Sequence, residues 1–244
     1  MRFIIQEQPY EKPIMAGEYR YERDGQPTGA VEKWRLTDAA AGYRFLRVDL
    51  DARDAVSGHT YLYHALLNAQ TQVERLQYRF WTNVSGGLQV TGSVILERDS
   101  VLATRTVNGK ESEQVLTLPH RYRFWFPSVA GLNFVNGGMK TAVSTSRHHS
   151  AKPDSGQGVT LNGQVGDEDT LAVQEVANLN YLPLSTAGME MEAAGKTHQY
   201  SRWRLSWGDG HWRIIMRAAD TGWPLGMERD DGLTAVARQY INYH

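Results

Sequence analysis

The sequence predicts an all-β fold: a large curved antiparallel sheet, built as a half-barrel or a barrel-like sandwich, with a long Gly/Ser-rich loop or lid. Three observations support this prediction. A unit of three residues, aromatic then arginine then apolar, recurs along the chain. Clusters of Gly, Pro, Asn and Asp separate apolar runs at intervals of about 8–12 residues, as in sandwiches and barrels. Residues 128–158 lack this pattern and are rich in Gly, Ser and Thr.

The three-residue unit describes the two faces of the predicted sheet. Successive side chains of a strand point to opposite faces, so each unit places two apolar groups on one face and an arginine on the other. The recurrence therefore predicts an aromatic face and an arginine-rich face. The units are Tyr19–Arg20–Tyr21, Trp34–Arg35–Leu36, Tyr43–Arg44–Phe45, Tyr78–Arg79–Phe80, Tyr122–Arg123–Phe124, Trp203–Arg204–Leu205 and Trp212–Arg213–Ile214.

The beginning of the chain reads as an arm followed by a meander. Residues 1–16 hold two prolines and no clear periodicity, and we expect them to lie along the sheet. Residues 17–24 and 30–37 form a hairpin, because the turn between them is rich in Gly, Asp and Pro. In the next strand, 43–51, the apolar positions change phase after Phe45. Either a bulge at Phe45 or burial on both faces of the strand explains this change.

Residues 59–83 fit either a helix or two strands, and we expect strands at 61–67 and 71–82 around a polar turn. A strand at 88–98 follows a pair of glycines. Asn108–Gly109 is a strong hairpin signal between strands at 101–107 and 112–118. Strand 120–126 ends this part of the sheet.

The 128–158 stretch is long for a connection without structure, so we expect a functional lid or a disordered segment. A short apolar helix or flap at its start would use Val129, Leu132, Phe134, Val135 and Met139. The sheet then resumes with strands at 159–165, 171–179, 197–207, 211–218, 227–229 and 233–243, and between them residues 181–185 precede a strand or loop at 187–193. We expect a single domain, 1–244, in which 17–126 forms the first sheet segment and 159–244 the second.

Composition excludes several classes of protein. Twenty-six basic and 27 acidic residues give a formal net charge of −1, which argues against a nucleic-acid binder or a polybasic membrane protein. The absence of cysteine removes disulfides, thiolate catalysis and Cys-based metal sites. The N-terminus has no apolar signal region, and no run approaches the ~18–20 apolar residues of a membrane span. We therefore expect a cytoplasmic protein, or a periplasmic one only if a leader has been removed.

The histidines do not predict a metal site. His148 and His149 are adjacent within the 128–158 stretch, but no His-x-His or His-x-x-x-His spacing accompanies them. Histidines in such polar stretches are usually solvated. His64 and His120 lie in apolar strands, where a hydrogen-bonded structural histidine is more common than a general base. We expect neither a metal nor a cofactor.

The acidic residues and serines do not form a recognisable catalytic motif. Residues 167–169 and 230–231 place carboxylates in Gly-flanked turns, where acids commonly cap the backbone. Asp49 and Asp51 share one strand face, without a partner motif. No Gly-x-Ser-x-Gly elbow is present, and residues 136–141 lack the first glycine of a phosphate-binding loop. We therefore expect no catalytic residues.

The order of signals resembles bacterial lipid- and lipoprotein-carrier proteins of the LolA/LolB type. The hairpin from Gly17–Glu18–Tyr19–Arg20–Tyr21 to Trp34–Arg35–Leu36 carries part of the resemblance, and the rest lies in the turn at 219–225 with the following strand at 231–233. The resemblance implies a meandering antiparallel sheet around a hydrophobic cavity that a helix or loop closes. The chain departs from that family because it has neither a signal peptide nor a lipobox cysteine.

Two interpretations of the aromatic face remain open. In the first, the sheet is a closed sandwich and the protein's own side chains fill the aromatic face. In the second, this face forms a concave cavity that binds a lipid-like or other apolar small molecule without catalysis. The alternatives are a carbohydrate-active hydrolase with cleft carboxylates and a structural or interaction module with a filled core. The predicted ligand-binding residues are Trp34, Phe45, Tyr78, Phe80, Tyr122, Phe124, Trp203 and Trp212.

Overall fold

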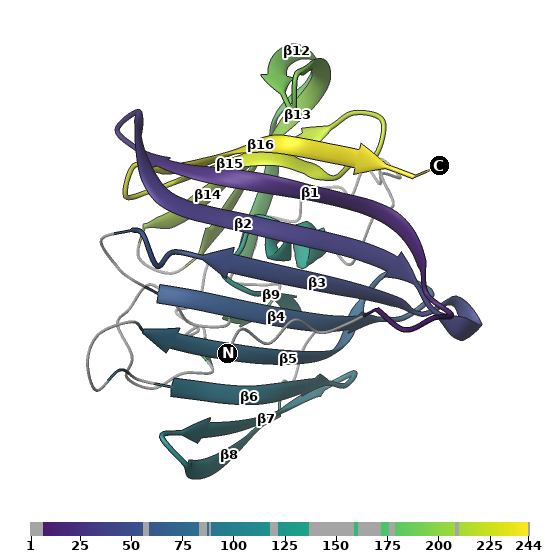
Figure 1. The fold of residues 1–244 in the computed structure, drawn as a ribbon, viewed down its shortest axis with the longest axis vertical. Helices are drawn as coiled ribbons and strands as arrows, with labels where there is room; N and C mark the ends of the chain where they lie inside the picture. Colours follow the sequence, from purple (N-terminus) through teal and green to yellow (C-terminus); the bar gives the residue numbers. More distant parts are fainter. Residues whose placement is uncertain are drawn as a thin grey trace.

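The computed structural model describes residues 7–55, 59–82, 87, 89–117, 122–136, 159–160, 172–175, 179–207 and 210–243. Within these ranges, thirteen strands form one antiparallel sheet, which confirms the predicted all-β fold (Figure 1). The strands are β1 (Lys12–Arg23), β2 (Gln26–Asp38), β3 (Arg44–Asp51), β4 (His59–Leu67), β5 (Val73–Thr82), β6 (Gln89–Leu96), β7 (Ser100–Val107), β8 (Lys110–Thr117), β12 (Leu179–Ala193), β13 (Lys196–Trp207), β14 (His211–Ala218), β15 (Pro224–Arg229) and β16 (Leu233–Asn242).

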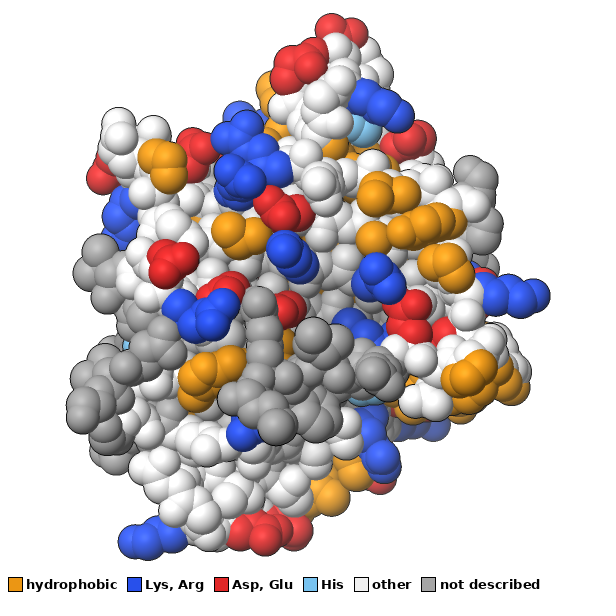
Figure 2. Space-filling view, viewed as in Figure 1, with side chains coloured by type: hydrophobic (Ala, Val, Ile, Leu, Met, Phe, Trp, Pro, Cys, Tyr) orange, Lys and Arg blue, Asp and Glu red, His pale blue; other side chains and the backbone are white. Residues whose placement is uncertain are grey.

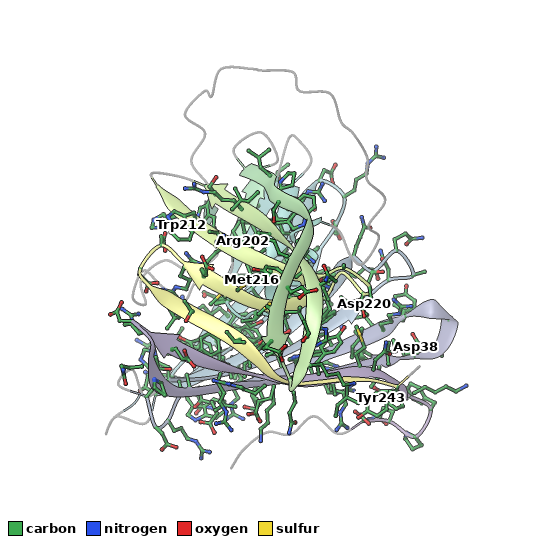
Figure 3. The ribbon with its side chains drawn as sticks, turned by 90° about the horizontal axis from the view of Figure 1, so that it is seen from above. Asp38, Arg202, Trp212, Met216, Asp220 and Tyr243 are labelled. Atoms are coloured by element: carbon green, nitrogen blue, oxygen red, sulfur yellow. The ribbon has the colours of Figure 1, made fainter. Side chains whose placement is uncertain are left out.

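The chain begins in the middle of this sheet. The spatial order is β12-β13-β14-β15-β16-β1-β2-β3-β4-β5-β6-β7-β8, so the last strand, β16, pairs with the first strand, β1. The order has two ends, β12 and β8, and the sheet is therefore open rather than a closed barrel. The sheet is also strongly curved, because β12–β15 rise steeply from the plane of β1 and β2 (Figure 3).

A smaller sheet and a short helical segment lie between the two halves of the chain. β9 (Tyr122–Trp125), β10 (Val159–Thr160) and β11 (Ala172–Glu175) form the smaller sheet, in the order β10-β11-β9. The 3₁₀ helix η2 (Gly131–Asn136) follows β9, and a second one, η1 (Ala40–Gly42), connects β2 to β3. Figure 1 shows η2 behind β2 and β3. We call the side of the large sheet that faces η2 the inner face, and the opposite side the outer face.

Several predicted elements have different boundaries in the structure. β1 begins at Lys12, so residues 12–16 belong to the sheet and, of the described residues, only 7–11 form an arm. β12 is one long strand where the sequence predicted two short elements; its pairing with β13 shifts register between Pro183 and Met189. Such shifts fit an edge strand that contains proline, which has no amide hydrogen to donate. The two strands predicted for 59–83 are confirmed as β4 and β5.

The three-residue units follow the predicted phase in four of seven places. Units that begin at Tyr19, Trp34, Tyr78 and Trp203 turn their aromatic and apolar side chains to the inner face, as the cross-strand registers show. The unit at Tyr122 belongs to the smaller sheet through β9.

The two remaining units are reversed, and their prediction was wrong. Leu46 and Val48 pair with inner-face residues of β2, so Phe45 lies on the outer face. No register shift interrupts β3, so burial on both faces, and not a bulge, explains the change of phase. Trp212 is also on the outer face, because Ile215, three residues further along β14, faces inward. A local triplet shows that side chains alternate, but not which side is the inner one.

The outer face carries mixed charges. Figure 2 shows Lys and Arg side chains interleaved with Asp and Glu on this face. The outer arginines pair with acids along the sheet, in the ion pairs Arg20–Glu18, Arg35–Glu7, Arg47–Glu11, Arg202–Glu228 and Arg238–Glu22. The pairs from Glu7 and Glu11 fix residues 7–11 against β2 and β3, so this part of the predicted arm lies along the sheet. Within the described residues, no helix has the length and hydropathy needed to cross a membrane.

Candidate functional site

The centre of the inner face is filled by the protein itself. Residues 126–136, which we call the plug, follow β9, include η2 and pack into the curve of the large sheet. Phe126 lies 4.7 Å from Tyr63 of β4, between ring centroids, and 6.2 Å from Phe134. The buried side chains of the plug are Phe126, Ser128, Val129, Ala130, Leu132, Asn133, Phe134 and Val135. The flap predicted at the start of the 128–158 stretch is therefore a buried core element as far as it is described, and Met139 lies outside the described residues.

A buried carboxylate holds the beginning of the plug. Glu32 of β2 has no solvent exposure, and its Oε2 accepts hydrogen bonds from the Tyr21 hydroxyl at 2.5 Å and the Val129 amide at 2.9 Å. Its Oε1 accepts a bond from the Ala130 amide at 2.9 Å. Burial raises the pKa of Glu32 to about 7, although these three donors act in the opposite direction. Among the described residues no Lys or Arg forms an ion pair with Glu32, so desolvation is the dominant influence on this carboxyl group.

The aromatic residues around Glu32 form a closed cluster. Trp34 stacks on Trp223 at 4.4 Å and on Tyr19 at 6.1 Å, between ring centroids. The Trp223 indole donates a hydrogen bond to the Tyr19 hydroxyl at 2.9 Å, and this hydroxyl donates to the carbonyl of Pro224 at 2.7 Å. Burial, and then the nearby charge of Glu32, raise the pKa of Tyr19 well above its ordinary value. The cluster is part of the core and leaves no exposed ring for a ligand.

A buried arginine holds the plug at Leu132 and Asn133. Arg217 of β14 is 7% exposed and donates to the Asn133 side-chain oxygen at 2.7 Å and to the Leu132 carbonyl at 3.2 Å. It also donates to the Gly222 carbonyl and the Tyr181 hydroxyl, both at 2.8 Å. Glu32 thus binds the amide hydrogens of Val129 and Ala130, and Arg217 binds oxygens of Leu132 and Asn133 in the first half of η2.

The inner face of β12–β14, which we call the inner wing, is covered less completely. Tyr181 and Trp203 stack with their ring centroids 4.9 Å apart, and both are only half-buried. Trp207, also half-buried, meets the buried Trp125 of β9 at 5.1 Å. The Arg213 guanidinium lies over the Trp207 ring at 5.1 Å. The inner wing therefore combines partly exposed aromatic rings with guanidinium groups.

The structure separates the eight residues predicted to bind a ligand. Trp34, Phe80 and Phe124 are buried in the core. Tyr78 and Trp203 face inward and remain half-buried, but seven strands of the sheet lie between β5 and β13, which carry them.

The other three predicted residues are placed differently. Phe45 and Trp212 lie on the outer face, where Arg47 stacks on Phe45 and Arg204 on Trp212. Figure 3 labels Trp212 together with Arg202 and Met216, which are also outer-face residues of β13 and β14. The side chain of Tyr122 lies outside the described part. The eight residues therefore do not form one surface.

Groups that would support metal or acid–base chemistry are few in the described ranges. No cluster of three or more His, Asp or Glu side chains there is placed to hold a metal ion. His148, His149, His120 and residues 167–169 lie outside those ranges. His211 contacts Asp230 at 3.1 Å in an exposed turn. His64 lies on the outer face beside Phe45, and burial, then the charge of Arg47, lower its pKa to about 4.

The polar residues that hold the plug were not identified from the sequence. Glu32 interrupts the inward phase of β2 two residues before Trp34, and Arg217 takes the inward phase of Ile215. A charge at a position that the strand period assigns to the core is a usable signal, because such charges require dedicated partners. No family model, curated protein or solved structure matches the chain.

Proposed function

We propose that the protein binds a lipid-like or other apolar small molecule on the inner wing, without catalysing a reaction. The observation that carries the proposal is the half-buried state of Tyr181, Trp203 and Trp207 on the inner face. These rings sit beside a centre that the plug already fills. Partly exposed aromatic surface on the concave side of an open sheet is the environment that apolar ligands select.

The contrast between the two parts of the inner face locates the proposed site. Around the plug, neighbouring side chains of the protein cover the aromatic rings, as the filled-core interpretation requires. On the inner wing, the stacked pair of Tyr181 and Trp203 offers flat apolar area beside a guanidinium, which suits an amphiphile better than a purely apolar molecule.

A carbohydrate hydrolase gains no support from the described residues. Such an enzyme needs two carboxyl groups that face each other across the substrate. Glu32 is the acidic residue that the described core contains, and three hydrogen-bond donors already occupy its two oxygens. An interaction module with a filled core remains the contrasting hypothesis, and it predicts that no small molecule binds.

Native mass spectrometry of freshly purified protein tests the proposal. We expect a mass increment from a retained apolar ligand, or uptake of a fluorescent fatty-acid probe that a saturating non-fluorescent fatty acid reverses. A clean apo mass together with no probe uptake would exclude small-molecule binding and favour the interaction module.

A further inference from the structure

Arg217 is a buried cation with no acidic partner among the described residues. Its side chain donates hydrogen bonds to Tyr181, Gly222, Leu132 and Asn133, and each acceptor is a neutral oxygen. Burying a guanidinium costs free energy that a carboxylate offsets better than neutral oxygens do. The position therefore suits an anion that the described residues do not supply.

Asn133 is an imperfect partner for this cation. Its side-chain oxygen lies 2.7 Å from the Arg217 Nη1, and the residue is 1% exposed. Its side-chain nitrogen is buried and finds no hydrogen-bond partner among the described residues. A buried donor without a partner lowers the stability of the fold. The Asn133 side chain thus gives Arg217 only a neutral acceptor and leaves its own buried nitrogen without a partner.

This place adjoins the inner wing. The Arg217 Nε donates to the Tyr181 hydroxyl, and its guanidinium lies 6.0 Å from the centroid of the same ring. Tyr181 in turn stacks on Trp203. A molecule lying on the Tyr181 and Trp203 rings would therefore have one end close to Arg217.

We propose that Arg217 binds the carboxylate head group of an amphiphilic ligand, whose apolar chain lies on the inner wing, and that the Asn133 side chain occupies the head-group position when no ligand is bound. The inference rests on the proposed function. When the Asn133 side chain leaves, it frees one Nη1 hydrogen of Arg217, and main-chain carbonyls keep the other hydrogens of Nη1 and Nη2. A carboxylate oxygen in that place accepts a charge-assisted hydrogen bond, which is stronger than the bond to a neutral amide oxygen. Tyr181 and Gly222 hold Arg217 in place while Asn133 moves away.

The contrasting interpretation makes Arg217 a purely structural clamp on the plug. Both interpretations predict that loss of Arg217 destabilises the fold, so a substitution of Arg217 does not separate them. The substitution Asn133→Asp separates the two interpretations. It keeps the shape of the side chain, removes the unpartnered nitrogen and supplies an internal carboxylate to Arg217.

The test compares two probes of equal chain length, dodecanoic acid and dodecan-1-ol, by displacement of a fluorescent fatty-acid probe at pH 8. We expect wild-type protein to bind the acid roughly 10- to 100-fold more tightly than the alcohol, the range for a hydrogen-bonded charged pair. In Asn133→Asp the preference should fall to near unity, while the melting temperature rises. Asn68→Asp, in the turn between β4 and β5, adds the same charge away from the inner face and should keep the wild-type preference.

Each other outcome overturns the inference in a recognisable way. Equal affinity of wild-type protein for acid and alcohol would leave ligand binding intact but remove the head-group site. A preference that survives in Asn133→Asp would place the head group elsewhere. Failure of both probes to bind would overturn the proposed function together with the inference.

Discussion

Glu32 and His64 should give the folding stability two opposite pH dependences that nearly cancel. Glu32 has a folded pKa of about 7 against 4.5 for an ordinary glutamate, so its contribution to stability is present below pH 4.5 and is lost as the pH rises to 7. The gap between these values corresponds to about 3 kcal/mol for this fully buried group. Substituting Glu32 should therefore reveal the opposite pH dependence of the folding stability, which comes from His64.

His64 acts in the other direction. Its folded pKa of about 4 lies below the ordinary 6.5, so the unfolded chain takes up a proton first and stability is lost as the pH falls from 6.5 to 4. After allowance for its partial exposure to solvent, this loss is about 2 kcal/mol. Wild-type stability should thus change little between pH 4.5 and 6.5.

Urea denaturation at pH 4.5, 5.5, 6.5 and 7.5 measures these dependences, through the free energy of unfolding at each pH. Glu32→Gln should become more stable by about 2 kcal/mol as the pH rises through this range, because only the His64 contribution remains. His64→Phe should become less stable by about 3 kcal/mol over the same range. If both variants keep the wild-type profile, burial does not set the ionisation of Glu32 and the described role of this residue is wrong.

Two substitutions test the packing of the inner face. Gly17→Ala should lower the free energy of unfolding by about 1–3 kcal/mol, because its Cβ would lie 2.6 Å from the Gln239 carbonyl oxygen and 2.7 Å from the Trp34 ring; an unchanged melting temperature would contradict this contact. Phe126→Ala should cost about 3–5 kcal/mol in urea denaturation, because it leaves a cavity under the plug. Val115→Ala, at a position 62% exposed, is the matched control and should stay within about 0.5 kcal/mol of wild type.

The sequence was sufficient to predict the fold class because local signals determine it. Turn residues such as Asn108–Gly109, with positive φ at both positions, and the period of two along the strands are short-range features. The order of strands was not predictable in this way. The pairing of β16 with β1 joins the two ends of the chain, and no local pattern records a contact of that kind.

The candidate site was harder to predict, for a physical reason. Alternation in a strand divides its residues into two sets, but only tertiary packing decides which set faces the core. Phe45 and Trp212 were therefore assigned to the wrong face, where arginines stack on them. Whether an inward ring is covered depends on distant residues, as Phe126 covers Tyr63. The sequence therefore could not separate the filled centre from the inner wing.

The most direct test of ligand binding on the inner wing uses two tryptophans on opposite faces of one hairpin. Trp203 faces inward and Trp212 outward, and both are half-buried, so their alanine variants remove the same ring from the two sides. Titration with a fluorescent fatty-acid probe should show affinity reduced about 10-fold or more in Trp203→Ala, the loss of one aromatic contact, and unchanged in Trp212→Ala. Equal affinities in the two variants, or a larger loss in Trp212→Ala, would contradict binding on the inner face.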